Sequence, residues 1–173
     1  MVNDIINTPT ENHFVRFEVK NYETIAEQRK YNGIRVNLIC KIKNTRTHLS
    51  IDFAVGDIVI PSPQKKSLPV ILSDFKKPNI FTYSLESIIS EKLDAIITRM
   101  ETTSRMKDFY DIYYLAKNHD FEGRKLQEAI YRTLSNRGTP FEKDSIDIIN
   151  RLGDNDIIVK RWKNFCKNVF RKK

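Results

Sequence analysis

Apolar residues recur every second residue in the first part of the chain and about every 3.6 residues after residue 83. This change of period limits the folds that the chain can adopt. In the first half, apolar and polar residues alternate in VRFEV, GIRVNLICKIK and HLSIDFAV, which predicts three strands with one packed face each. The link KNTRTH is long enough for the second and third of these strands to form a hairpin. The proline-rich stretch PSPQKKSLPVILSDFKKPN should be irregular, with a short strand at PVIL.

The second half has helical periodicity. Ser84 is a suitable N-cap for a helix over about 85–99. Further helices are expected over about 105–117, 124–135, 142–151 and 156–170, with glycines near the breaks between the later ones. The sequence therefore predicts an α+β protein, with an antiparallel sheet region over 1–80 followed by a helical domain over 81–173.

The composition is that of an ordinary globular protein, with 173 residues, 40% of them hydrophobic and 30% charged. No apolar run is long enough to span a membrane, and the polar start MVNDIINTPTEN has no signal-peptide core. Cys40 and Cys166 form neither a metal-binding pattern nor a disulfide framework. We expect a cytoplasmic protein with no membrane partner.

The net charge of +8 favours an anionic partner such as a nucleotide or a nucleic acid. Many basic residues lie in the C-terminal stretch KRWKNFCKNVFRKK, where they alternate with aromatic ones. This stretch is either an amphipathic helix with a solvated basic face or a surface that contacts nucleic acid, and the pattern leaves both open.

A lysine interrupts the apolar stripe of the helix expected over 85–99. Lys92 falls between Ile88 and Ile96 on the helical wheel, and a lone buried ammonium is costly unless it is paired, reaches solvent or faces a pocket. Arg99 lies on the same edge of the helix, and two such cations suit phosphate binding.

The next helix has the opposite anomaly. Asp108 lies within its apolar arc, and Asp111 lies at the edge of that arc, one turn further on. Lys92 and Asp108 can therefore face a common space, either as a structural ion pair or as the lining of a nucleotide site. A third carboxylate, Asp52, lies on the polar face of the last predicted strand, where it is either solvated or positioned to bind a metal or substrate.

The segments YSLESIISEKLDAIITR and SRMKDFYDIYYL resemble the AbiEii/AbiGii family of nucleotidyltransferase-like toxins, part of the DNA polymerase beta nucleotidyltransferase superfamily. The matching positions in the helical half are Tyr83, Glu86, Glu91, Lys92, Arg99, Arg105, Lys107, Asp108 and Asp111. The strand segment IDFAVGD resembles the family's ID-x-x-x-GD at Asp52, Gly56 and Asp57. The resemblance covers about residues 12–120.

This resemblance implies a toxin–antitoxin or abortive-infection component that transfers a nucleoside monophosphate from a nucleoside triphosphate to RNA, such as a tRNA end, or to a protein. It implies that Lys92 contacts phosphate together with Arg99, Arg105 and Lys107. Asp108 or Asp111 would be a second essential group, and Asp52 would bind Mg²⁺.

The family's first motif, a Gly-Ser turn followed by an Asp-x-Asp pair, has no counterpart in this sequence. The only Asp-x-Asp, DND at 154–156, reads as a turn and a helix N-cap. We therefore expect no transfer by the chain alone, and an open sheet edge that favours a homo-oligomer, a separate N-terminal segment or a cognate antitoxin. The alternative is a non-catalytic module that binds nucleic acid or the antitoxin.

Overall fold

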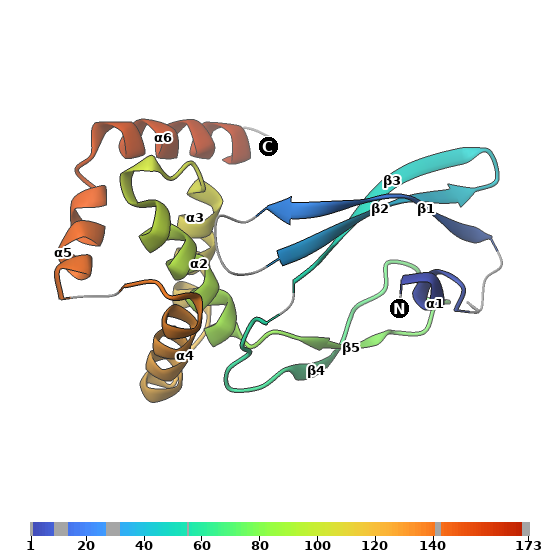
Figure 1. Ribbon diagram of the computed structural model, residues 1–173, viewed down its shortest axis with the longest axis horizontal. Helices are drawn as coiled ribbons and strands as arrows, with labels where there is room; N and C mark the ends of the chain where they lie inside the picture. Colours follow the sequence, from blue (N-terminus) through green and yellow to red (C-terminus); the bar gives the residue numbers. More distant parts are fainter. Residues whose placement is uncertain (1, 9–13, 27–31, 55, 141–142, 171–173) are drawn as a thin grey trace. The chain divides into compact units, whose positions relative to one another are not determined.

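The computed structural model describes residues 2–8, 14–26, 32–54, 56–140 and 143–170. The chain forms two compact units, Met1–Asp57 and Ile58–Lys173 (Figure 1). The first unit carries a three-stranded sheet, and the second carries a small hairpin and the larger helices. This is the predicted α+β architecture, whereas the predicted functional division at residue 80 stays a prediction.

The first unit contains α1 (Val2–Ile6) and the antiparallel strands β1 (Val15–Ala26), β2 (Asn32–Ile42) and β3 (Thr45–Phe53), in the order β1-β2-β3. All three predicted strands are confirmed. The β2–β3 turn is tighter than the predicted six-residue link, because the strands pair up to Ile42 and Thr45. Lys43 makes this turn possible with a φ of 50°.

The register of the sheet places the apolar residues of its three strands on one face. Leu38 of β2 pairs with Val19 of β1 and Leu49 of β3, and Leu38 is buried. A bulge between Val19 and Asn21 shifts the alternation in β1, so Tyr22 pairs with Val36 beyond it. Beyond this bulge, β1 stays paired with β2 as far as Ala26, well past the alternating segment VRFEV.

The second unit begins with a two-stranded hairpin, β4 (Gln64–Ser67) paired with β5 (Asn79–Thr82). The strand predicted at PVIL is therefore wrong, since residues 69–72 lie in the connection between β4 and β5, where Ile71 is fully exposed. Pro69 has no backbone N–H to donate to a ladder, whereas QKKS and NIFT contain no proline.

The five predicted helices are confirmed within two residues at each end. They are α2 (Leu85–Arg99), α3 (Met106–Asn118), α4 (Gly123–Arg137), α5 (Lys143–Leu152) and α6 (Asp156–Phe170), with the short 3₁₀ helix η1 (Met100–Thr102) after α2. None of the described helices is long and apolar enough to cross a membrane.

Side chains and backbone geometry explain where these helices begin and end. Ser84 caps α2 as predicted, because its hydroxyl accepts a hydrogen bond from the Ser87 N–H at 3.1 Å. Gly138 ends α4 in the left-handed conformation with a φ of 63°. The DND segment is a helix cap as predicted, since the Asn155 side chain accepts hydrogen bonds from the first N–H groups of α6.

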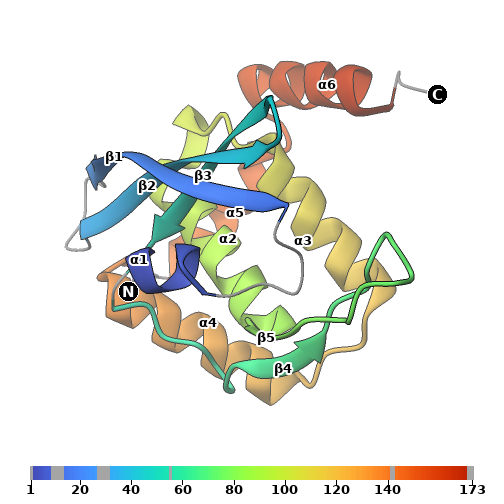
Figure 2. The same ribbon diagram turned by 90° about the vertical axis from the view of Figure 1, so that its right-hand side faces the viewer.

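Helix α2 packs against both α3 and α4, and α6 lies across the end of α3 (Figures 1 and 2). The core is formed by Ile96 of α2, Met106 of α3, Leu152 of α5 and Ile158 of α6. Trp162 and Phe165 pack against this core from α6. This cluster therefore joins two helix pairs, α2 with α3 and α5 with α6, that are distant from each other in the sequence.

Candidate functional site

Lys92 joins α2 to α3 through two carboxylates. Its Nζ donates hydrogen bonds to Asp108 Oδ1 at 3.0 Å and to Asp111 Oδ2 at 2.6 Å. The side chain of Lys92 is 20% exposed, and that of Asp108 is 4% exposed. The common space that the sequence predicted for the misplaced lysine and the misplaced aspartate is therefore present.

Two further cations, both from the start of α3, complete this group. Arg105 Nε lies 2.5 Å from Asp108 Oδ2, and Lys107 Nζ lies 3.2 Å from Asp111 Oδ2. The side chain of Lys107 is 76% exposed, and that of Arg105 is half exposed. We call these five residues, Lys92, Arg105, Lys107, Asp108 and Asp111, the lysine cluster.

The start of α3 explains why the buried carboxylate of Asp108 is tolerated here. Asp108 lies in the first turn of α3, and its N–H donates to the carbonyl of Arg105 at 2.9 Å. The N-terminal end of a helix carries partial positive charge, which favours a carboxylate at this position. The anions are thus held inside the lysine cluster, and its more exposed cations lie at the rim.

The pKa shifts in the lysine cluster keep its central pair ionised. Burial lowers the pKa of Lys92, but its hydrogen bonds with Asp111 and Asp108 outweigh burial, and the pKa lies above the ordinary value of 10.5. Burial raises the pKa of Asp111, but hydrogen bonds from Lys92 and Lys107 bring it below the ordinary value of 3.8. Lys92 is therefore an ammonium, and Asp111 a carboxylate, throughout the neutral range.

The structure does not bring Arg99 into this cluster. Arg99 is the exposed last residue of α2, about 10 Å along the helix axis from Lys92. Among the described residues, Arg99 joins none of the ion pairs of the lysine cluster.

Asp52 belongs to the first unit, where it accepts a two-fold hydrogen bond from Arg35 at 2.7 and 2.8 Å. This arginine holds the pKa of Asp52 below its ordinary value. Its predicted role as a metal ligand stays a prediction. Val55, in the predicted strand end next to it, lies outside the described residues.

A second polar group on α2 was not singled out from the sequence. Asp94 is buried and faces α4, where Arg137 Nη1 donates to it at 3.2 Å and the Thr139 hydroxyl donates to Oδ1. Arg137 also lies 3.7 Å from Glu91. Ser87 and Ser90 lie on the same side of α2 as Asp94, and both are buried. These two small polar residues were the sequence feature that could have revealed a polar side of this helix.

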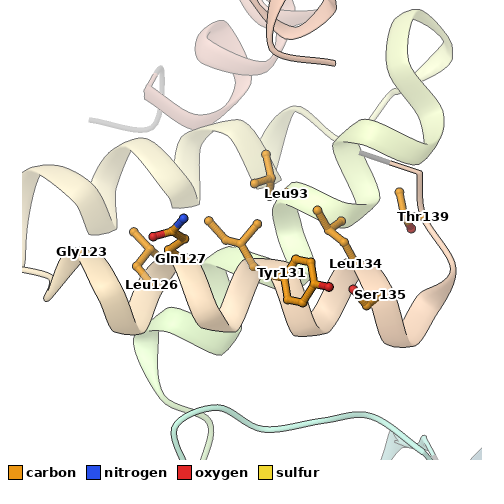
Figure 3. A pocket seen from close by; sticks show the side chains of 9 residues that line it. Leu93, Gly123, Leu126, Gln127, Tyr131, Leu134, Ser135 and Thr139 are labelled. Atoms are coloured by element: carbon orange, nitrogen blue, oxygen red, sulfur yellow. The ribbon is translucent and has the colours of Figure 1, made fainter. Parts of the chain in front are cut away.

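A groove of about 550 Å³ lies beside this second group, between α2 and α4 (Figure 3). Its walls are mainly apolar, with polar atoms from residues such as Gln127, Ser135 and Thr139. Among the described residues, no lysine or arginine lines it. A phosphate would find no cation in this groove, so the lysine cluster is the better candidate site for a nucleotide.

Comparison with known proteins places the whole chain in one family. The family model described as "Nucleotidyl transferase AbiEii toxin, Type IV TA system" matches residues 1–173. No curated protein and no solved structure gives a significant match.

Proposed function

We propose a function from the premise that this chain belongs to the AbiEii family of nucleotidyltransferase toxins of type IV toxin–antitoxin systems. The lysine cluster binds the phosphates of a nucleoside triphosphate. Bound there, the nucleotide is the donor of a nucleoside monophosphate to an RNA or protein acceptor. This assigns the predicted polar residues of α2 and α3 to one substrate-binding site.

The observation that carries this proposal is the position of the Lys92 ammonium. Two carboxylates hold it in a fixed place, yet a fifth of its side chain reaches the surface. The lysine cluster contains three cations and two carboxylates, so it retains an excess of one positive charge. A triphosphate arriving from solvent meets the exposed ends of Lys107 and Arg105 before it reaches Lys92.

The carboxylates of the lysine cluster act mainly as positioning groups in this proposal. The pKa of Asp111 is lowered, so its carboxylate is a weak acceptor for the proton of an attacking hydroxyl. Asp108 is nearly buried and already accepts hydrogen bonds from Lys92 and Arg105. Both carboxylates therefore orient Lys92 toward the phosphates.

Magnesium enters this proposal together with the nucleotide. In the part of the chain that the structure describes, no group of three or more metal-ligating side chains could hold a metal ion. Asp108 and Asp111 are also neutralised by neighbouring cations, so the cluster by itself does not fit a Mg²⁺ site. Mg²⁺ commonly binds proteins through substrate phosphates, and we propose that it arrives on the triphosphate.

In nucleotidyl transfer, an acceptor hydroxyl oxygen forms a bond to the α-phosphorus while the bond from that phosphorus to the bridging oxygen breaks and pyrophosphate leaves. The family's Asp-x-Asp pair, which resemblance assigns to this step, has no counterpart in these 173 residues. We therefore propose nucleotide binding for the chain by itself, and transfer only when such a pair is supplied. A cognate antitoxin is the protein partner that the family implies.

Calorimetric titration with each of the four nucleoside triphosphates and magnesium tests this proposal. We expect saturable binding that weakens in Lys107→Gln and is lost in Lys92→Ala. Lys125→Gln is the matched control, because Lys125 is also an exposed, ion-paired lysine but lies on α4. No binding by the wild type would refute the proposal, and so would equal effects of Lys107→Gln and Lys125→Gln.

A second candidate function is a non-catalytic module that binds nucleic acid or the antitoxin. The net charge of +8 favours it, together with the basic residues of α6. This candidate predicts salt-sensitive RNA binding without any binding of nucleoside triphosphates.

A further inference from the structure

Helix α3 presents a face of tyrosines that the lysine cluster does not use. Three of the seven tyrosines lie in this helix, at positions 110, 113 and 114. Tyr113 is 59% exposed and Tyr114 is 49% exposed. Residues three and four apart share one side of a helix, so both exposed rings lie beside Tyr110. We call Tyr110, Tyr113 and Tyr114 the tyrosine face.

The rings of the tyrosine face are supported from beneath. Tyr110 stacks on Tyr114 with their centroids 6.2 Å apart, and it contacts two rings of α6, Phe165 at 6.1 Å and Phe170 at 5.8 Å. Phe165 in turn packs against Trp162, which borders the hydrophobic core. Tyr114 is therefore a solvent-facing ring with a fixed base, which reduces the conformational entropy lost when a flat ligand stacks on it.

The surroundings of the tyrosine face are positively charged. Lys117 Nζ lies 5.7 Å from the centroid of the Tyr113 ring, and the exposed Lys107 begins the same side of the helix one turn before Tyr110. The adjoining helix α6 carries four basic residues and a single acidic one, Asp156. Exposed aromatic rings between lysines are suited to a ligand that has flat bases and phosphates.

The tyrosine face adjoins the lysine cluster along α3. Lys107 belongs to the lysine cluster through its ion pair with Asp111, and Tyr114 lies three residues after Asp111 on the same helix. Seven residues, about two helical turns or roughly 10 Å along the helix axis, separate Lys107 from Tyr114. A strand of a few nucleotides on the tyrosine face can therefore span this distance and place one of its phosphates near Lys107.

We propose that the tyrosine face binds single-stranded nucleic acid, with bases stacked on Tyr113 and Tyr114 and phosphates contacted by Lys107 and Lys117. Unpaired strands are favoured because a duplex hides the faces of its bases. The binding itself does not depend on the nucleotide proposal. The further statement that this strand is the acceptor does rest on the function proposed above.

Fluorescence anisotropy with a labelled 12-nucleotide RNA of mixed sequence, single-stranded or in a duplex, tests the proposal. We expect Tyr113→Ala and Tyr114→Ala each to weaken single-strand binding about 5- to 100-fold, the range typical for the loss of one base–aromatic stack. Tyr113→Phe keeps the flat ring and should bind as the wild type does. Tyr131→Ala changes a tyrosine on α4 that is more exposed, at 71%, so it is the matched control and should also bind normally.

Equal affinity of the wild type and both alanine variants would overturn the proposal. So would a wild type that binds the duplex as tightly as the single strand, or one that binds no RNA, which would leave this face to a protein partner. Calorimetry with nucleoside triphosphates separates the two proposals. If RNA binding requires Tyr113 but no triphosphate binds, the nucleotide proposal fails and the tyrosine face stands.

Discussion

Replacement of Lys92 by methionine removes the ammonium that two carboxylates share at 3.0 and 2.6 Å. Loss of one partner from a buried ion pair typically costs about 3–5 kcal/mol, because an uncompensated charge remains. In this variant Asp108 is still paired with Arg105, and Asp111 with Lys107. We therefore expect a cost at the lower end of this range, about 3 kcal/mol. For a chain of this size, that lowers the melting temperature by about 6–12 °C.

The double variant Lys92→Met with Asp108→Leu should be more stable than Lys92→Met alone. An apolar pair of similar volume replaces a buried ion pair with little loss, and often with some gain. We therefore expect the double variant to lie within about 1 kcal/mol of the wild type. The difference from additivity measures the coupling between the two side chains.

Urea unfolding followed by the fluorescence of Trp162 measures these free energies. Trp162 is the only tryptophan of the chain, and it packs against the core of the second unit, so its signal reports the unit that contains the lysine cluster. Nucleotide titration of the same variants separates a structural role from a binding role. If Lys92→Met leaves the free energy of unfolding unchanged, or if the two single costs add in the double variant, the described pairing is wrong.

Three further predictions concern other parts of the second unit. Asp94→Asn should cost about 2–4 kcal/mol, because it leaves the largely buried Arg137 with only the more distant carboxylate of Glu91, at 3.7 Å. Arg132→Gln, which breaks an exposed pair within α4, is its control and should change stability by less than about 0.5 kcal/mol in the same urea titrations. Ser84→Ala removes the cap of α2 and should cost about 1–2 kcal/mol by thermal unfolding, and an unchanged melting temperature would show that the cap is dispensable. Finally, the pKa of Asp111 is lower in the folded state, so its stabilisation is present above pH 3.8 and is lost as the pH falls through the folded value. The stability advantage of the wild type over Asp111→Asn should therefore decline in acid unfolding curves as the pH falls below 3.8, and an advantage that is already lost above pH 3.8 would contradict the shift.

Local patterns were sufficient to predict most secondary structure. The three strands follow from alternation, and α2 follows from its stripe and the Ser84 cap. The strand at PVIL was wrong because its pattern is apolar but Pro69 does not suit a ladder. The β4–β5 pairing was missed because it joins residues about fifteen positions apart whose sequences carry no strong alternation.

The candidate site was only partly visible in the sequence. The anomaly at Lys92 followed from a single helical wheel, since a cation in an apolar stripe is costly wherever the helix packs. The Asp94–Arg137 pair was missed because it links residues 43 positions apart, and neither residue is unusual on its own helix. Ser87 and Ser90 mark the polar side of α2 on which Asp94 lies, but its partner Arg137 can be assigned only when the packing of α2 on α4 is known.

The sequence by itself determined the element order, the helix caps and the presence of misplaced charges on α2 and α3, because each depends on residues within a few turns of one another. Only the tertiary structure decided which charges meet. It placed Lys92 between Asp108 and Asp111, directed Asp94 to the opposite side of α2, and left Arg99 outside the cluster. The physical reason is that periodicity shows only on which face of its helix a side chain lies. The packing of the helices sets the distances between charged side chains, and electrostatic pairing depends on those distances.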